Sequence, residues 1–312
     1  MIRFLKDWAL IIAIIAGVIG YFTYAYLPIF DSVRVYANDA VEVLQPLLIF
    51  SMLFLTFSKM ELRDLRLRKW HCWLLLFQTL MFTGIGVILI LLPESGLRVI
   101  LEGAMLCLIC PTATAAAVIT RRLGGNVSSI TTYTILINMM VAVVIPVMVP
   151  FVHPQPDMSF LSSAALILAK VFPLLLLPLI ITLILRKYAP RFTLKVARYQ
   201  DLSFYIWIVA LALAMALTTR SMVHSNIAIS TQLGLVVVSF TCCFLQFYIG
   251  RKIGHHYGEK ITAGQSLGQK NTVLAIWMGY TFFTPVTAIA GGFYSIWHNL
   301  VNTYQLRHSK GE

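Results

Sequence analysis

Acidic residues are scarce in this sequence, and charge of either sign is rare. Only 12% of the 312 residues are charged, about half the usual share of a soluble domain, and 12 acidic residues stand against 24 Lys and Arg. Apolar residues make up 59% of the chain, and the mean hydropathy is +0.83. This composition predicts an all-α integral membrane protein without an independent soluble domain.

The long apolar stretches lack carboxylates at mid-membrane depth, which excludes several classes of function. A sodium/proton antiporter would need one or two carboxylates in the fifth or sixth stretch. The acidic residues nearest to the stretches, Asp39, Glu42 and Glu102, are expected close to the outer surface. There is also no His-Glu-x-x-His motif, and the His pair at 255–256 lies in a basic loop, so we expect no enzyme.

Cysteine is also infrequent, and its pattern does not predict a metal site. The five cysteines all lie in or beside apolar stretches: Cys72, Cys107, Cys110, Cys242 and Cys243. Cys107 and Cys110 form a C-x-x-C motif, but no second Cys or His pair completes a zinc site. We interpret the cysteines as small apolar residues that pack helices, and we expect no cofactor.

The apolar stretches predict ten membrane spans, since a spanning helix needs roughly 20 mostly apolar residues. The predicted spans are residues 8–27, 40–58, 72–93, 100–120, 129–152, 162–185, 203–222, 231–250, 264–282 and 284–305. The first span lacks a small-residue cleavage site and continues to Pro28, so we interpret it as a retained helix.

Basic residues gather in alternate loops between the spans. The Lys- and Arg-rich loops cover residues 59–69, 121–122, 186–198 and 251–260, whereas the opposite loops hold only Arg34, Arg98 and Arg220. By the positive-inside rule, both termini are cytoplasmic, in an inner or plasma membrane. The net charge of +12 thus orients the chain in the lipid bilayer, and we expect no nucleic acid and no protein partner.

The ten spans divide into two sets of five, residues 1–155 and 156–312. An odd number of spans in each half places the halves upside down relative to each other. This inverted-repeat plan is common among secondary transporters.

The fourth span of each half is interrupted by residues that break a helix. In the first half Pro111 is followed by Thr112 and Thr114, and in the second half Gly268 precedes Gln269 and Lys270. Breaks at membrane depth require protein groups or a wet cavity to satisfy the backbone. Either span alone could simply be kinked, but matched breaks in both halves predict a transport site.

At these two spans the chain resembles the bile acid:sodium symporter family. The segment CPTATAAAVITRRLGGNVS (110–128) is similar to that family's fourth-helix motif, and GQKNTVLA (268–275) to its ninth-helix motif. The segment GFYSIWHN (292–299) is close to its tenth-helix signature. We interpret the chain as a bacterial member with degenerate sodium sites.

The resemblance implies a fold with two parts and a transport cycle. A panel would hold spans 1, 2, 6 and 7, and a core would hold spans 3–5 and 8–10, with broken helices four and nine crossing near the midplane. Transport would proceed by alternating access. In the family, the transport of an organic anion is driven by two sodium ions.

Several residues that bind sodium in the family are replaced here. A Ser-Asn pair matches Ala116 and Ala117, a key Glu matches Ser266, a sodium-binding Gln matches Lys270, and one Ser becomes Ile130. Two further positions, Gln78 and Thr134, do match the family. Since sodium, like other hard cations, prefers several oxygen ligands, the resemblance implies that this site is impaired.

Lys270 adds a cation near the predicted break in span nine. A charge at the bilayer centre costs at least about 2.5–3.5 kcal/mol. Our leading hypothesis is that its ammonium group takes the place of a sodium ion and points at Gln78 and the unwound carbonyls of span four, within a cation-site surrogate that also includes Gln269, Ser266 and Thr134. Transport would then be sodium-independent, and protonation of Lys270 offers a route to proton coupling.

Two alternatives for Lys270 stay open. It either binds the anionic group of the substrate directly or snorkels to the cytoplasmic surface. The second intramembrane lysine, Lys170, either snorkels as well or contacts an anionic substrate in the cleft.

We expect the substrate to be a small or amphipathic organic anion. The resemblance places Thr114, Asn271 and His298 near its polar end, and we add Thr112 and Asn299 as neighbours of these positions. Two alternative functions are a sodium-coupled symporter of the bile-acid type and a ligand sensor built on the same fold.

Overall fold

The computed structural model describes residues 2–60, 62–199 and 201–308. These residues form helices and contain no β-strand beyond one isolated bridge. The α-helices are α1 (Ile2–Tyr26), α2 (Asp31–Ser58), α3 (Lys69–Leu91), α4 (Arg98–Ile109), α5 (Ala116–Arg122), α6 (Val127–Val152), α7 (Phe160–Leu175), α8 (Leu177–Tyr188), α9 (Pro190–Arg198), α10 (Leu202–His224), α11 (Ile229–His256), α12 (Lys260–Gly268), α13 (Thr272–Phe282) and α14 (Ala288–His308). Two short 3-10 helices cover Pro28–Phe30 and Leu62–Asp64.

Six of the described helices are long and apolar enough to cross a membrane by themselves. They are α1, α2, α3, α6, α10 and α11, and α7 with α8 adds a seventh span if the two helices are counted together. Each of the ten predicted stretches overlaps a helix or a pair of helices. The chain is therefore a helical membrane protein, and the count of ten spans in two inverted repeats remains a prediction.

The chain forms two compact units. Unit 1 contains Met1–Lys59 and Pro178–Asn226, and unit 2 contains Met60–Leu177 and Ile227–Glu312. Span six, which the resemblance assigns wholly to the panel, is divided between them, because α7 belongs to unit 2 and most of α8 to unit 1.

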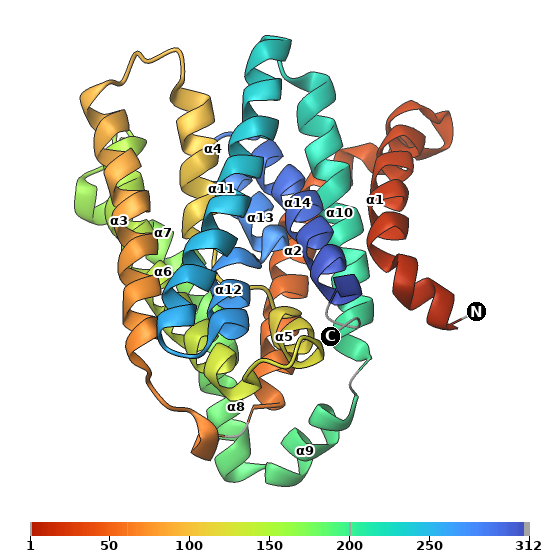
Figure 1. Ribbon diagram of the computed structural model, residues 1–312. Helices are drawn as coiled ribbons and strands as arrows, with labels where there is room; N and C mark the ends of the chain where they lie inside the picture. The colour runs from red at the N-terminus through yellow and green to blue at the C-terminus, as the bar shows by residue number, and fades with distance from the viewer. Residues whose placement is uncertain (1, 61, 200, 309–312) are drawn as a thin grey trace. The chain divides into compact units, whose positions relative to one another are not determined.

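In unit 1, α1 packs closely against α10 (Figure 1). Ala13, Leu211 and Met215 form the buried centre of this contact. Gly17 permits the close approach, because a Cβ atom there would lie 2.4 Å from the Ala212 carbonyl oxygen. Small residues at such crossings let helix backbones touch within a membrane.

In unit 2, α12 lies alongside α11 (Figure 1). Gly250 on α11 has no room for a side chain, because a Cβ atom would lie 2.6 Å from the Ala263 carbonyl oxygen. The tight packing fixes α12 on the longer helix. The break that follows α12 is thereby held in a defined position within unit 2.

Candidate functional site

Both predicted breaks are present, and the two unwound segments pair with each other in unit 2. α4 ends at Ile109 and α5 begins at Ala116, whereas α12 ends at Gly268 and α13 begins at Thr272. We call residues 110–115 and 269–271 the crossover segments. Their backbones form an antiparallel bridge between Thr112 and Lys270.

Two backbone hydrogen bonds hold the crossover segments together. The Ala113 amide donates to the Gln269 carbonyl at 2.8 Å, and the Asn271 amide donates to the Pro111 carbonyl at 2.9 Å. Each break therefore satisfies part of the backbone that the other leaves unpaired. This mutual pairing explains how irregular backbone is tolerated at membrane depth.

Side chains from other helices bind the carbonyl groups at the C-terminal end of α4. The Gln78 Nε2 donates to the carbonyl oxygens of Ile109 at 2.9 Å and Cys110 at 3.1 Å. The Gln246 Nε2 donates to the Cys107 carbonyl at 3.2 Å. A helix end leaves its last carbonyls without partners inside the helix, so these amides cap α4.

The C-terminal end of α12 is capped in a similar way. The Thr112 Oγ1 donates to the Ser266 carbonyl at 2.6 Å, and the Tyr294 hydroxyl donates to the Gly268 carbonyl at 2.8 Å. The Gln246 Nε2 also lies 3.1 Å from the Tyr294 hydroxyl, which joins the two helix ends in one network.

Lys270 lies between these helix ends and is only 1% exposed. Its Nζ atom faces the Leu108 carbonyl oxygen at 3.5 Å, which is long for a hydrogen bond. The snorkelling alternative is therefore wrong, because the side chain turns into the protein and does not reach the surface. The helix end that it faces carries partial negative charge, so the contact favours an ammonium group.

Gln78 does not serve as the partner that we expected for Lys270. Its amide nitrogen binds the α4 carbonyls, and its Oε1 accepts a hydrogen bond from the Tyr133 hydroxyl at 3.2 Å. Gln78 instead donates to the Ile109 carbonyl, and Lys270 faces the neighbouring Leu108 carbonyl of the same helix end.

The structure brings both cysteine pairs to Lys270, which the sequence pattern did not reveal. The thiols of Cys107, Cys110, Cys242 and Cys243 lie near Lys270, and no described carboxylate forms an ion pair with it. Cys110 Sγ donates to the Asn271 carbonyl at 2.9 Å. Among the described residues, no group of three or more His, Cys, Asp or Glu side chains is arranged to hold a metal ion.

Three predicted site residues next to Lys270 keep buried polar atoms without a hydrogen-bond partner. These atoms are Ser266 Oγ, Gln269 Oε1 and Asn271 Nδ2. The Asn271 Oδ1 accepts from the Leu274 amide at 3.3 Å and so caps α13. The free atoms are available to an ion, a water molecule or a ligand.

The remaining predicted residues lie in unit 2 but make local contacts. Thr134 and Asn299 donate to carbonyls of their own helices, at 2.9 Å to Ile130 and 2.7 Å to Ser295. Thr114 is half-buried in its crossover segment. His298 is buried, packs edge-on against the Tyr294 ring at 5.8 Å, and leaves its Nδ1 without a partner.

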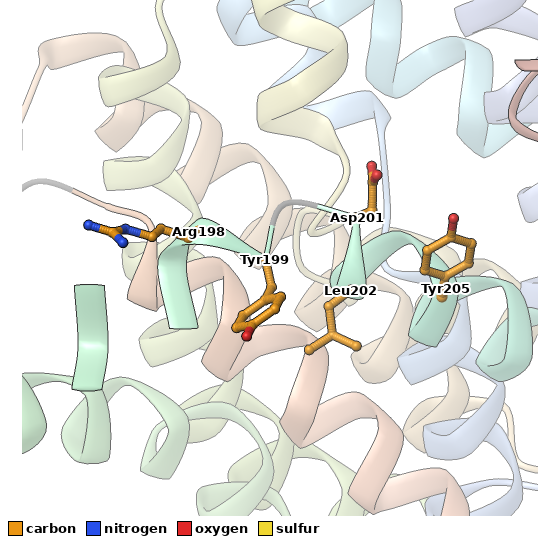
Figure 2. Close-up of a pocket in the computed structure, with 5 residues that line it drawn as sticks. All are labelled: Arg198, Tyr199, Asp201, Leu202 and Tyr205. Carbon is orange, nitrogen blue, oxygen red and sulfur yellow. The ribbon is translucent and has the colours of Figure 1, made fainter. Parts of the chain in front are cut away.

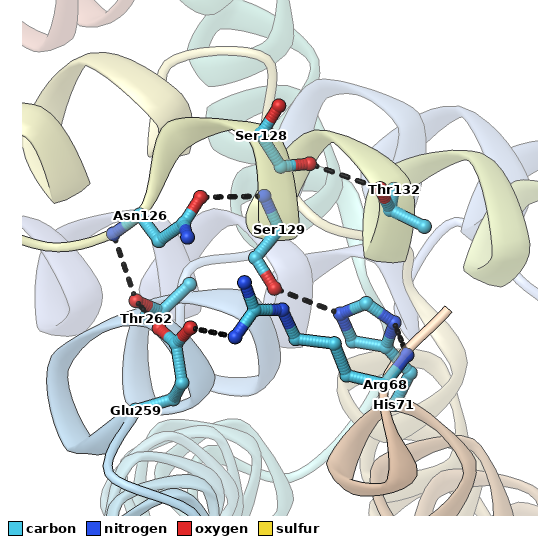
Figure 3. Close-up of polar contacts among 8 residues, drawn as sticks. All are labelled: Arg68, His71, Asn126, Ser128, Ser129, Thr132, Glu259 and Thr262. Carbon is cyan, nitrogen blue, oxygen red and sulfur yellow. Dashed lines mark hydrogen bonds and ion pairs between the residues drawn. The ribbon is translucent and has the colours of Figure 1, made fainter. Parts of the chain in front are cut away.

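A polar cluster in unit 2 fixes the beginning of α12 (Figure 3). Arg68 forms an ion pair with Glu259 at 2.6 Å, and the Thr262 Oγ1 donates to the same carboxylate at 2.7 Å. The Asn126 backbone amide donates to Thr262 Oγ1 at 3.0 Å, and the Asn126 side chain caps α6 by accepting from the Ser129 amide. These contacts tie the beginnings of α3, α6 and α12 together.

Unit 1 contains a separate pocket with a volume of about 480 Å³ (Figure 2). It is lined by Arg198, Tyr199, Asp201, Leu202 and Tyr205, and includes none of the predicted site residues. The polar ends of these side chains point in different directions in Figure 2, so they do not converge on one ligand group.

Lys170 lies on α7, where its side chain is exposed and borders a small cavity of unit 2. Glu102 is only 1% exposed. Its carboxylate binds Arg98 Nε at 3.0 Å and accepts from the Thr287 hydroxyl at 3.1 Å.

A sequence model of the SBF-like CPA transporter family matches residues 8–296. The match covers nearly the whole chain, including both crossover segments, and it confirms the resemblance that the two broken spans indicated. No curated protein matches this sequence.

Proposed function

The chain belongs to the SBF-like CPA transporter family and is a membrane transporter, and from this premise we propose that it moves an organic anion by alternating access without sodium. In this proposal the Lys270 ammonium group stands where the related symporters hold a sodium ion. The protein would work in an inner or plasma membrane with both termini in the cytoplasm.

The position of Lys270 at the end of α4 is the observation that carries the proposal. The ammonium group is buried, faces the Leu108 carbonyl, and forms no ion pair with a described carboxylate. Half-helix C-terminal ends are the places where many secondary transporters coordinate their coupling cation. A tethered ammonium group provides one positive charge and three donors at such a place.

The replacements in the chain support the same conclusion. Ala116 and Ala117 stand where the family has a Ser-Asn pair, and neither side chain offers an oxygen. Ser266 replaces a Glu, so a negative charge is lost where a positive one is gained. With Ser266 in place of the Glu and with Lys270 added, the local charge stays close to that of the family's site when it holds its sodium ions.

We place the anionic or polar end of the substrate at residues that border the crossover segments. These residues are Thr112, Thr114, Asn271, His298 and Asn299. Asn271 and His298 support this assignment because each keeps a buried nitrogen without a hydrogen-bond partner. The cargo is a small or amphipathic organic anion.

Retained sodium coupling is the second candidate, and one observation favours it. Ser266 Oγ and Gln269 Oε1 are buried oxygens without partners, and a sodium ion accepts such ligands. Under this alternative, Lys270 would give up its place to the ion.

Thermal unfolding of the purified protein in detergent separates the two candidates without knowledge of the substrate. Sodium is titrated against potassium and choline at matched ionic strength, for the wild type and for Lys270→Gln. A ligand that binds only the folded state raises its stability by RT ln(1 + [L]/Kd), so even weak sites respond at high sodium. The proposal predicts no sodium-specific shift in the wild type and a lower midpoint for Lys270→Gln, whereas a sodium-specific shift in the wild type contradicts it.

A further inference from the structure

A small cavity in unit 2 lies apart from the helix-end network that surrounds Lys270. It is enclosed by the end of α6, the following loop, α7 and the end of α13, and its volume is about 90 Å³. The lining residues are Val149, Pro150, His153, Gln155, Ser163, Leu166, Ile167, Lys170, Thr281 and Phe282.

Lys170 supplies the positive charge of this cavity. It lies ten residues beyond the start of α7 at Phe160, which corresponds to about 15 Å along the helix. No described residue of unit 2 forms a hydrogen bond or an ion pair with its ammonium group. An unpaired cation is unfavourable at this depth in a membrane, and intramembrane charges typically face a cavity and a ligand.

Neutral donors stand near Lys170 at the same cavity. The side chains of Gln155 and Ser163 both line it, and neither makes a hydrogen bond to another described residue of unit 2. Ser163 is only 4% exposed, so its hydroxyl is directed inward. One ammonium group with an amide and a hydroxyl matches the acceptor atoms of a carboxylate or sulfonate.

Glu102, whose carboxylate lies beside the cavity residue His153, does not neutralise Lys170, because other groups hold it. Glu102 is bound by Arg98 and Thr287, and its Oε1 lies 3.1 Å from His153 Nε2 without hydrogen-bond alignment. His153 therefore lies between the cavity and Glu102, whose charge is already balanced by Arg98. Lys170 therefore gives the cavity a net positive charge.

The size of the cavity and its walls restrict the ligand. One liquid water molecule occupies about 30 Å³, so a space of about 90 Å³ accepts an anionic group but not a large organic body. Leu166, Phe282 and Val149 provide apolar walls at its border. The rest of the ligand would therefore be apolar and lie outside the cavity.

We propose that this cavity binds the carboxylate or sulfonate group of an amphipathic anion, with Lys170 as its charge partner. The inference rests on the proposed function for the class of ligand, an organic anion, but it adds a second binding site that is independent of Lys270. Two sources share this chemistry, namely a dissolved organic anion and an anionic phospholipid, and we assign the site to the dissolved anion.

The test compares an anion with its neutral analogue in the full-length protein in dodecyl maltoside. Thermal unfolding is followed against cyclohexanecarboxylate and cyclohexanecarboxamide, for the wild type, Lys170→Gln, Lys170→Arg and Lys270→Gln. Lys187→Gln serves as a matched control, because it removes an exposed lysine at the end of α8. A second series replaces the probes with phosphatidylglycerol and phosphatidylcholine in the micelles.

We expect the carboxylate to stabilise the wild type more than the carboxamide does. Lys170→Gln should weaken this response at least about tenfold in apparent affinity, Lys170→Arg should retain it, and Lys187→Gln should leave it unchanged. Equal responses to the two probes in the wild type, or a carboxylate response of unchanged apparent affinity in Lys170→Gln, would overturn the proposal. A shift that depends on Lys170 but occurs only with phosphatidylglycerol would also overturn it.

These outcomes are separate from those for the sodium question. A sodium-specific shift in the wild type contradicts the proposed role of Lys270. The anion response of the Lys170 variants can still be interpreted in that case. Loss of the carboxylate response in Lys270→Gln alone would move the anion to the crossover segments and contradict the second site.

Discussion

Thr112 Oγ1 donates a hydrogen bond of 2.6 Å to the carbonyl oxygen of Ser266, although the two residues lie 154 positions apart in the chain. The bond joins the first crossover segment to the last turn of α12. Lys270, two residues beyond the end of α12, forms the backbone bridge with the same threonine. The position of the cation therefore depends on contacts between the two halves of the sequence.

Thr112→Val should destabilise the protein by about 1 kcal/mol or more, because the Ser266 carbonyl is left buried without its donor. Thr112→Ser keeps the hydroxyl and should stay close to the wild type. The unfolding midpoint in detergent measures both. Thr114→Val is the matched control, since the half-buried Thr114 makes no comparable bond, and an equal loss in Thr112→Val and Thr114→Val would contradict this account.

Gln78→Leu should have a larger effect, since one side chain serves three partners. The substitution removes the donor to the Ile109 and Cys110 carbonyls and the acceptor for the Tyr133 hydroxyl. We expect a loss of about 1–3 kcal/mol in the free energy of unfolding. Chemical or thermal unfolding checks this value.

Thr134→Val is the comparison for Gln78→Leu, because Thr134 bonds only to its own helix. It should change the stability much less. If the two variants unfold alike, the amide of Gln78 does not hold the end of α4.

Gly268→Ala should destabilise unit 2, because an added Cβ atom would lie 2.4 Å from the ring of Phe247. Overpacking of this kind costs about 1–3 kcal/mol. Gly84→Ala is the control, since nothing lies within 4 Å of its added Cβ, and helix propensity favours alanine there. A Gly268→Ala variant as stable as Gly84→Ala would show that the crossover tolerates a side chain.

A maleimide reagent should label one cysteine in the folded protein. Cys72 is exposed, whereas Cys107, Cys110, Cys242 and Cys243 are buried around Lys270. Reactivity of a thiol requires both access and ionisation, and burial in apolar surroundings opposes both. Mass spectrometry should find the label on Cys72, and Cys72→Ser should abolish it.

Labelling of Cys107 or Cys110 without denaturant would contradict this prediction. It would mean that the space around Lys270 opens to water in the resting protein. Lys270 would then be buried only part of the time.

The sequence predicted the breaks well, because Pro111 and Gly268 act locally on the backbone. The resemblance also singled out Gln78, although not its role in binding the α4 carbonyls. The partners of the helix ends were not predictable, since Gln246 and Tyr294 come from α11 and α14 and carry no local signal of a capping function. Likewise, Arg68 and Glu259 lie 191 positions apart, so that only the folded chain brings them together.

The same distinction applies to the burial of Lys270 and Glu102. Lys270 follows a polar run near a basic loop, which is compatible with snorkelling, but the pairing with Thr112 turns its backbone inward. Glu102 lies near the predicted outer end of its apolar stretch, and the sequence does not show whether its side chain is buried. It is buried because Arg98 and Thr287 bind its carboxylate.

The central claim is that Lys270 occupies the position of a coupling cation, and restoring the family's ligands tests it most directly. Sodium is titrated during thermal unfolding of a variant that combines Lys270→Gln, Ala116→Ser, Ala117→Asn and Ser266→Glu, with potassium and choline as references. The account predicts a sodium-specific rise of the midpoint in this variant and none in the wild type. A sodium-specific rise in the wild type, or no response in a folded restored variant, would contradict it.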